Sequence, residues 1–318
     1  MEYFTRRVRY VSFSSAGSQG HLHLGSLLAL KSHMGSDAYA SWCSSLLGVS
    51  GCSAGCFSAL SVLLCLNMDQ LHEMLPLGNI IPQLTSDIQS FPKLLGASDV
   101  RIIIDIVSTI LNHGGLSSSV TMESLYRFTR IECIFVCTSV LQEKKIYVSH
   151  TSHPHVRVVD AVAASCCIPG VFRPVKINGE YMVDGNLLES IPIPFTMATT
   201  LYFVVGNPYN DSSLNMYGYI RSLMNIVTRY NAQVSCLPLQ RCIVLSHSSA
   251  VFDPFINKHD TNNIRFNGFI QTLSFLHFGN SKTLVSILHY CIEAYIRWSI
   301  CIDITTNCLE EMPRLFES

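Results

Sequence analysis

Apolar residues recur with two different spacings along the chain, and these spacings predict the first elements. Residues 8–13 (VRYVSF) are typical of a buried strand, and residues 21–32 carry leucines at helical spacing. Small polar residues at 14–20 separate the two. A second unit of strand, turn and helix follows around Ser53, with its helix at 56–66. This alternation predicts an α/β fold, with a mostly parallel central sheet and helices on both faces.

The pattern continues to about residue 250, after which it weakens. Further helices are expected at 122–130, near Ala161, at 216–232 and at 281–298, and further strands at 131–140, 145–149, 200–205 and 241–245. Asn178-Gly179 predicts a hairpin whose second strand leads to Asp184. We expect a catalytic domain over 8–250. A helical extension over 251–318 would pack on this domain or continue it, with the apolar face of 281–298 on the core or, alternatively, on lipid.

One stretch, residues 46–66, contains no charge and is long enough for a membrane span of about 20 residues. Its first half is crowded with Gly48, Gly51 and Gly55, which favour a turn over a continuous helix. We therefore predict a buried strand, a tight turn and a buried helix here.

Composition narrows the possible partners. The net charge is −1 and only 14% of residues are charged, which argues against a nucleic-acid partner. The mean hydropathy of +0.31 fits either a deeply buried core or a surface that docks on lipid.

The amino-terminal residues lack the apolar stretch of a secretory signal peptide, so a cytoplasmic location and reduced cysteines are expected. The 13 cysteines include no C-x-x-C pair, and most are expected to be small buried hydrophobes. No metal site is expected at the histidines either, which lack carboxylates at ligand spacing: 21, 23, 150, 153 and 155.

The candidate chemistry begins at Gly51–Gly55, which reads G-x-S-x-G. In serine hydrolases this motif places the nucleophile on a cramped strand-to-helix turn, where the glycines leave room. Ser53 would then lie at a helix N-terminus, where the Ala54 N–H and the helix dipole can stabilise a developing oxyanion. A glycine-rich turn with no catalytic role remains the alternative for the motif alone.

Three further stretches line up with this motif in order and spacing. Residues 15–25 (SAGSQGHLHLG) resemble the glycine-rich oxyanion loop of patatin-like phospholipases. Residues 164–174 (ASCCIPGVFRP) resemble the A-S-x-x-x-P-x-x-F-x-P stretch of that family, and residues 184–192 (DGNLLESIP) resemble its D-G-G/A-x-x-x-N-x-P motif. The resemblance covers residues 8–194.

This resemblance implies a patatin-like three-layer fold and a lipid acyl hydrolase of phospholipase or lysophospholipase type. It implies a dyad of Ser53 as nucleophile and Asp184 as base, with no metal or other cofactor. Acyl lipid would be the substrate, and contact with membranes would be peripheral. The oxyanion hole would consist of Ala16, Gly17, Ser18 and Ala54, and the supporting glycines would be Gly20, Gly51, Gly55 and Gly185.

The sequence also departs from the family. Ser15 and Ala16 replace two loop glycines, Gln19 replaces a basic residue, and Ser190 replaces an asparagine. Because of these changes, a catalytically inactive patatin-fold protein with a lipid-binding or regulatory role remains an alternative. A second alternative is an α/β-hydrolase esterase with a Ser53-Asp184-His247 triad, although that fold places several strands before the nucleophile.

Overall fold

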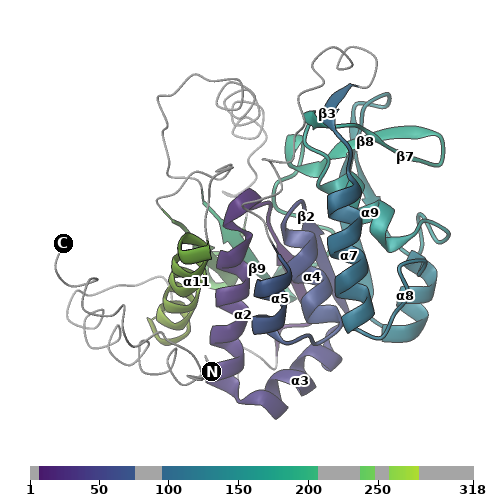
Figure 1. The fold of residues 1–318 in the computed structure, drawn as a ribbon. Helices are drawn as coiled ribbons and strands as arrows, with labels where there is room; N and C mark the ends of the chain where they lie inside the picture. The colour runs from purple at the N-terminus through teal and green to yellow at the C-terminus, as the bar shows by residue number, and fades with distance from the viewer. Residues whose placement is uncertain (1–6, 76–94, 207–236, 248–257, 279–318) are drawn as a thin grey trace.

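The computed structural model describes residues 7–75, 95–206, 237–247 and 258–278 (Figure 1). It confirms the predicted α/β class. The central sheet has eight strands in the order β10-β9-β1-β2-β4-β8-β7, with β5 also paired to β4. Its strands are β1 (Tyr10–Phe13), β2 (Gly48–Cys52), β4 (Glu132–Ser139), β5 (Lys144–Val148), β7 (Val175–Ile177), β8 (Glu180–Asp184), β9 (Thr200–Val205) and β10 (Cys242–Leu245).

The sheet is parallel from β10 through β4 and antiparallel beyond it, where β5 and β8 pair with β4 and β7 pairs with β8. All residues of β2 are buried, and so are all but the first of β4. Both faces of the sheet centre are therefore covered, as a parallel sheet requires. A separate parallel pair joins β3 (Gly96–Ser98) to β6 (Gly170–Phe172).

Several helices stand side by side in front of the sheet in Figure 1, among them α2, α4 and α7. The described helices are α2 (His21–Met34), α3 (Ser36–Ser45), α4 (Gly55–Leu63), α5 (Met68–Met74), α7 (Arg101–His113), α8 (Met122–Thr129), α9 (Val158–Ser165) and α11 (Lys258–Phe278). Short 3₁₀ helices are η1 (Gly17–Gly20), η2 (Gly185–Leu187), η3 (Met197–Thr199) and η5 (Leu239–Arg241).

Helices α2 and α11 approach each other closely through two glycines. A Cβ atom on Gly25 of α2 would lie 1.8 Å from the Arg265 carbonyl oxygen of α11. A Cβ atom on Gly268 of α11 would lie 2.1 Å from the Leu22 carbonyl oxygen of α2. The two backbones therefore touch, and α11 packs directly on the domain; the division at residue 250 remains a prediction.

Most predicted elements are present with ends shifted by one to three residues. The uncharged stretch at 46–66 forms β2, a turn and α4, as expected, and no described helix is both long and apolar enough to cross a membrane. Helix α4 ends at Leu63 rather than at residue 66, because Cys65 adopts a left-handed conformation. Sequence reasoning did not assign α3, α5, α7 or the β3–β6 pair. The helices expected at 216–232 and 281–298 lie outside the described residues.

Candidate active site

The turn between β2 and α4 has the geometry of a nucleophile elbow. Ser53 has a φ of 52°, a region that residues other than glycine seldom adopt. A Cβ atom on Gly51 would lie 2.7 Å from the Cys56 Cα, and one on Gly55 would lie 2.5 Å from the Ser14 carbonyl oxygen. Backbone crowding therefore explains both glycines of the motif and holds Ser53 at the amino end of α4.

Asp184 ends β8 and faces this turn. Its Oδ2 accepts a hydrogen bond of 2.8 Å from the Ser53 hydroxyl, and its Oδ1 accepts one of 2.8 Å from the Asn186 N–H. The side chains are almost inaccessible to water, with Ser53 6% and Asp184 1% exposed. The structure thus brings together two residues that lie 131 positions apart in the sequence.

Pairing with β4 explains why these two residues meet. Strand β2 runs parallel to β4 and its last residue, Cys52, pairs with Val136. Strand β8 runs antiparallel to β4, and its last residue, Asp184, pairs with Cys137. Because β5 occupies the other edge of β4, β2 and β8 lie along the same edge with their carboxyl ends toward each other. Gly185 follows directly, and a Cβ atom there would lie 2.3 Å from the Val136 carbonyl oxygen.

Burial changes the acid–base behaviour of Asp184. Loss of water around the carboxylate raises its pKa from 3.8 to about 7, although the Asn186 N–H and the Ser53 hydroxyl oppose this rise. A carboxylate with a pKa near 7 is a much stronger base than an exposed aspartate, and about half of it is ionised at neutral pH. Such a group is suited to accept a proton from a bound hydroxyl.

Ser165, at the end of α9, is a site residue that sequence reasoning did not single out. Its hydroxyl oxygen accepts a hydrogen bond of 3.0 Å from the Ser53 N–H and donates one of 2.6 Å to the Val136 carbonyl oxygen. The side chain is fully buried. Ser165 therefore fixes the strained backbone of Ser53 to β4. It lies in the A-S-x-x-x-P-like stretch, and this was the available signal.

The predicted oxyanion loop forms η1 at the carboxyl end of β1. Gly17 has a φ of 53°, which favours glycine, and Ala16, Ser18 and Gly20 are buried. Within the described residues, no acceptor takes a hydrogen bond from the Gly17 or Ala54 N–H. The Ser15 N–H donates to the Ser190 carbonyl oxygen at 2.8 Å. This bond ties the loop to the chain that follows Asp184.

Gln19, which stands where the family has a basic residue, is fully buried. Its side-chain amide donates a hydrogen bond of 3.5 Å to the His247 carbonyl oxygen beyond β10. The neutral side chain thus anchors the loop to the neighbouring strand end, a task that needs no positive charge. His247 takes part through its backbone, whereas the Ser53 hydroxyl donates directly to Asp184.

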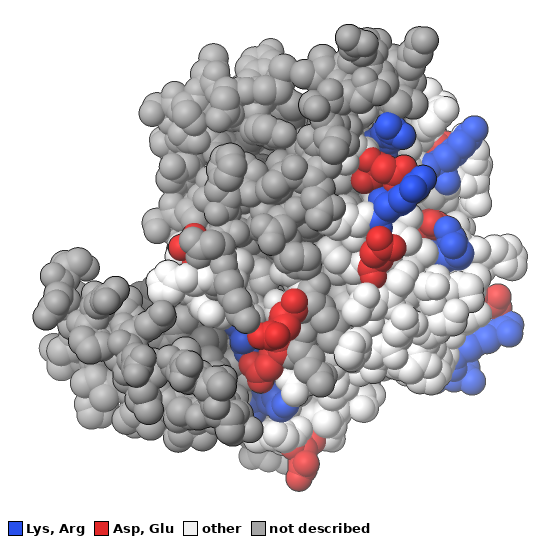
Figure 2. Space-filling model, in the orientation of Figure 1, with Lys and Arg blue, Asp and Glu red and all other residues white. Residues whose placement is uncertain are grey.

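The histidines considered as metal ligands are dispersed. His21 lies 3.0 Å from His72 between their Nδ1 atoms, and His23 is fully buried beside Phe13. His150 stacks on Tyr126. Among the described residues, no group of three or more His, Cys, Asp or Glu side chains could hold a metal ion. On the face shown in Figure 2, the basic and acidic side chains are interspersed rather than separated by sign.

Comparison with known proteins agrees with this geometry. The family model described as patatin-like phospholipase matches residues 11–197, which include the elbow, the loop and Asp184. The chain belongs to the patatin-like phospholipase family. Membership of this family supports a lipase-type function.

One solved structure supports the same fold. VipD from Legionella pneumophila aligns at 14% identity with a TM-score of 0.58, over 85% of this chain and 67% of VipD. The ExoU–SpcU complex of the type III secretion system of Pseudomonas aeruginosa matches at 15% identity with a TM-score of 0.46. That match covers 85% of the present chain and 51% of the matched chain, so the present chain spans about half the length of the matched one.

Proposed function

We propose that the protein is a serine lipid acyl hydrolase of phospholipase A or lysophospholipase type, acting through a Ser53-Asp184 dyad. The observation that carries this proposal is the buried hydrogen bond of 2.8 Å from the Ser53 hydroxyl to Asp184. An aspartate alone serves as the base because burial raises its pKa to about 7.

The chemistry follows from this contact. As Ser53 Oγ attacks the ester carbonyl carbon, Asp184 takes the hydroxyl proton, and it then gives that proton to the departing alcohol. Water next attacks the acyl-serine, again losing its proton to Asp184, and the returned proton restores the Ser53 hydroxyl. One ester and one water thereby yield one fatty acid and one alcohol.

We assign the oxyanion site to the backbone between η1 and the start of α4. Gly17 and Ala54 have N–H groups that are not used within the described structure, and Ala16 and Ser18 flank Gly17 in the same loop. Donors that are fixed in advance stabilise the developing oxyanion without rearrangement. The changes at Ser15 and Ala16 preserve every backbone donor, since neither residue is proline.

We propose that phospholipid bilayers dock on a surface near this site, at the β4–β5 turn. The β4–β5 turn, only a few residues beyond the partner of Asp184, exposes Val140 by 46% and Leu141 by 71%. The Val140 N–H donates to the Tyr181 carbonyl oxygen, and the Tyr181 ring is 41% exposed. Lys144 follows beside Glu143 at the start of β5, and the Lys145 ammonium pairs with the Glu189 carboxylate at 3.1 Å. Exposed apolar tips of this kind suit the surface of a lipid bilayer.

Vesicle sedimentation tests this surface. Leu141→Asp should lower binding to phosphatidylserine-containing vesicles at least about tenfold, because a buried leucine is worth about 1.5–3 kcal/mol. Leu47→Asp is the matched control, since Leu47 is 45% exposed and precedes β2 at the opposite end of the sheet. Equal loss in both variants would refute the assignment.

Covalent labelling tests the nucleophile. A fluorophosphonate probe should label the parent protein and leave Ser53→Ala unlabelled, and the same substitution should remove ester hydrolysis. Ser58→Ala is the matched control, because Ser58 is buried in the same helix α4. Labelling of Ser53→Ala at the parent rate would place the nucleophile elsewhere.

The second candidate is a role in lipid binding or regulation, carried out by a patatin-fold protein without catalytic activity. The altered oxyanion loop is the observation that favours it. Absence of both labelling and turnover in a folded, vesicle-binding parent protein would select this function. The histidine triad has less support, because Asp184 accepts a hydrogen bond from the Ser53 hydroxyl and, in the part of the chain that the structure describes, only β1 precedes the elbow strand.

A further inference from the structure

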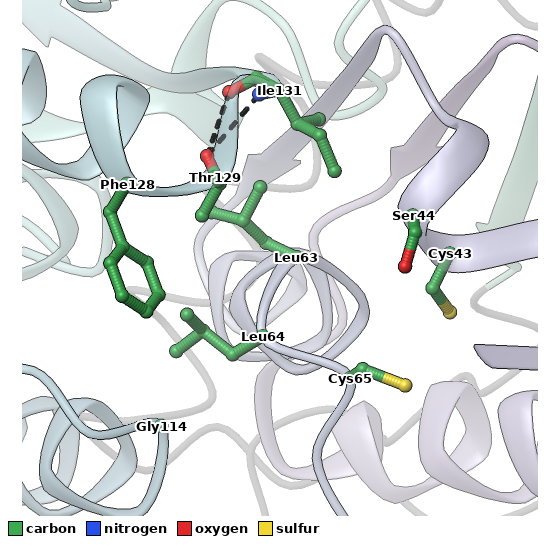
Figure 3. A pocket seen from close by; sticks show the side chains of 9 residues that line it. All are labelled: Cys43, Ser44, Leu63, Leu64, Cys65, Gly114, Phe128, Thr129 and Ile131. Atoms are coloured by element: carbon green, nitrogen blue, oxygen red, sulfur yellow. Dashed lines mark hydrogen bonds between the residues drawn. The ribbon is translucent and has the colours of Figure 1, made fainter. Parts of the chain in front are cut away.

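A surface pocket of about 260 Å³ lies at the opposite end of α4 from Ser53 (Figure 3). Much of its apolar wall comes from the end of α4, from α8 and from the α8–β4 connection, through Leu63, Leu64, Phe128 and Ile131. Two cysteines, Cys43 from α3 and Cys65, also line it. Because α4 separates it from the dyad, this pocket has no part in the ester chemistry proposed above.

Cys65 occupies an unusual backbone position. It follows α4 in the left-handed conformation, with a φ of 49°, where glycine is the usual residue. Its N–H donates to the Val62 carbonyl oxygen, and the Leu66 N–H donates to the Ser61 carbonyl oxygen, which ends the helix. This turn projects the Cys65 side chain out of the core, and it is exposed.

Cys43 lies beside it on α3 and is only 2% exposed. Figure 3 shows both sulfur atoms on the same side of α4, with the Cys43 side chain directed toward Cys65. A hydrogen bond from the Cys43 thiol lowers the pKa of Cys65 to about 6, which partial burial opposes and the Lys31 ammonium assists. The same hydrogen bond raises the pKa of Cys43. At neutral pH the pair is therefore an accessible thiolate next to a protonated thiol.

The other described cysteines differ from Cys65 in exposure, and several also differ in ionisation. All of them are buried, and burial raises the pKa of, for example, Cys52, Cys133 and Cys137. Thiols that are buried and protonated react slowly with oxidants. Cys65 is thus set apart from the rest of the described cysteines by exposure, and from several of them by ionisation.

We propose that Cys43 and Cys65 form a redox-active thiol pair that hydrogen peroxide oxidises to a disulfide. The Cys65 thiolate attacks one peroxide oxygen, the O–O bond breaks, and hydroxide leaves, so that Cys65 becomes a sulfenic acid. The Cys43 sulfur then attacks the Cys65 sulfur, and the sulfenic hydroxyl leaves with the Cys43 proton as water. Two thiols lose two electrons and one peroxide becomes two waters. The disulfide joins α3 to the end of α4.

Peptide mapping after oxidation tests the proposal. The folded protein is treated with hydrogen peroxide, its remaining thiols are blocked, and it is digested with chymotrypsin, which can cut after Phe57 and Leu64 and so separates Cys43 from Cys65. We expect a cross-link between these two residues in the parent and in the matched control Cys242→Ala, and none in Cys43→Ala. Sulfinic acid at Cys65 without a cross-link, or no oxidation at either residue, would overturn the proposal.

The pH dependence of alkylation gives a second measurement that does not depend on cross-linking. For a thiol with a pKa of about 6, the iodoacetamide rate at Cys65 should rise only about twofold from pH 6 to pH 8, against roughly 70-fold for an ordinary thiol. In Cys43→Ala the rise should exceed about tenfold, because the hydrogen bond is lost. Equal ratios in parent and variant, with both proteins folded by circular dichroism, would show that Cys43 does not activate Cys65.

Discussion

Replacing Asp184 by asparagine separates the chemical role of this carboxylate from its effect on stability. Asparagine has nearly the same shape, so its oxygen can still accept the Asn186 N–H, and its NH₂ can donate to Ser53 Oγ. It cannot take the hydroxyl proton. Loss of a general base lowers the rate by roughly 10²–10⁴, so we expect Asp184→Asn to fold and to lose nearly all ester hydrolysis.

The stability change has a definite sign and pH range. The Asp184 pKa is about 7 in the folded state against an ordinary 3.8, so the unfolded chain loses this proton first as the pH rises. The folded state therefore loses stability between about pH 4 and pH 7, by about 4 kcal/mol in total at 1.36 kcal/mol per pH unit. Asparagine carries no such penalty. Relative to the parent, Asp184→Asn should gain up to about 4 kcal/mol between pH 4 and pH 8.

The assay pairs two measurements on the same samples. Urea unfolding of parent and variant at pH 4, 6 and 8 gives the difference in unfolding free energy, and hydrolysis of a short-chain p-nitrophenyl ester gives kcat. The parent kcat/KM, measured with the same ester, should rise with pH around a midpoint near 7, as Asp184 of the free enzyme becomes ionised. Two results would refute this reasoning: a variant that keeps more than about a tenth of the parent rate, or a difference in unfolding free energy that does not change with pH.

Four further variants probe the rest of the site with the same ester. Ser165→Ala should lower kcat about fivefold at unchanged KM, because it removes one hydrogen bond that holds the Ser53 N–H, worth about 1 kcal/mol. An unchanged kcat would contradict this positioning role. His247→Ala should leave kcat within about twofold of the parent, and a thousandfold loss in a folded variant would favour the triad. Gly17→Val should lower kcat by roughly 10² or more, since valine disfavours a positive φ, whereas Ala16→Gly should not. Equal rates in both loop variants would place the oxyanion hole elsewhere.

Much of the site follows from local sequence patterns. The apolar runs around Gly51 and Gly55 predict a strand and a helix, and Asn178-Gly179 predicts the hairpin that leads to Asp184. Both features are present, in β2–α4 and β7–β8. Local patterns succeed here because turn geometry restricts which residues fit.

Other features depend on long-range packing, which local patterns do not encode. The meeting of Ser53 and Asp184 results from the pairing of β2 and β8 with consecutive positions of β4. The A-S-x-x-x-P-like stretch contains Ser165, but the stretch alone does not reveal that its hydroxyl accepts the Ser53 N–H. The replacement of a basic residue by Gln19 likewise became interpretable only when the His247 carbonyl was found beside it. Helix α7, by contrast, was predictable, since Ile103, Ile106 and Ile110 recur at helical spacing.

The glycine contact between α2 and α11 has a consequence for dissecting the protein. The family match ends at residue 197 and so excludes α11. Gly25 of α2, which lies within the match, nevertheless packs directly against a backbone carbonyl of α11. A fragment that stops at residue 197 would lack β9, β10 and α11, so it would uncover one edge of β1 and the Gly25 side of α2, which directly follows the η1 loop. The smallest piece that can retain a shaped loop next to Ser53 therefore extends at least through Phe278, well beyond the region by which the family is recognised.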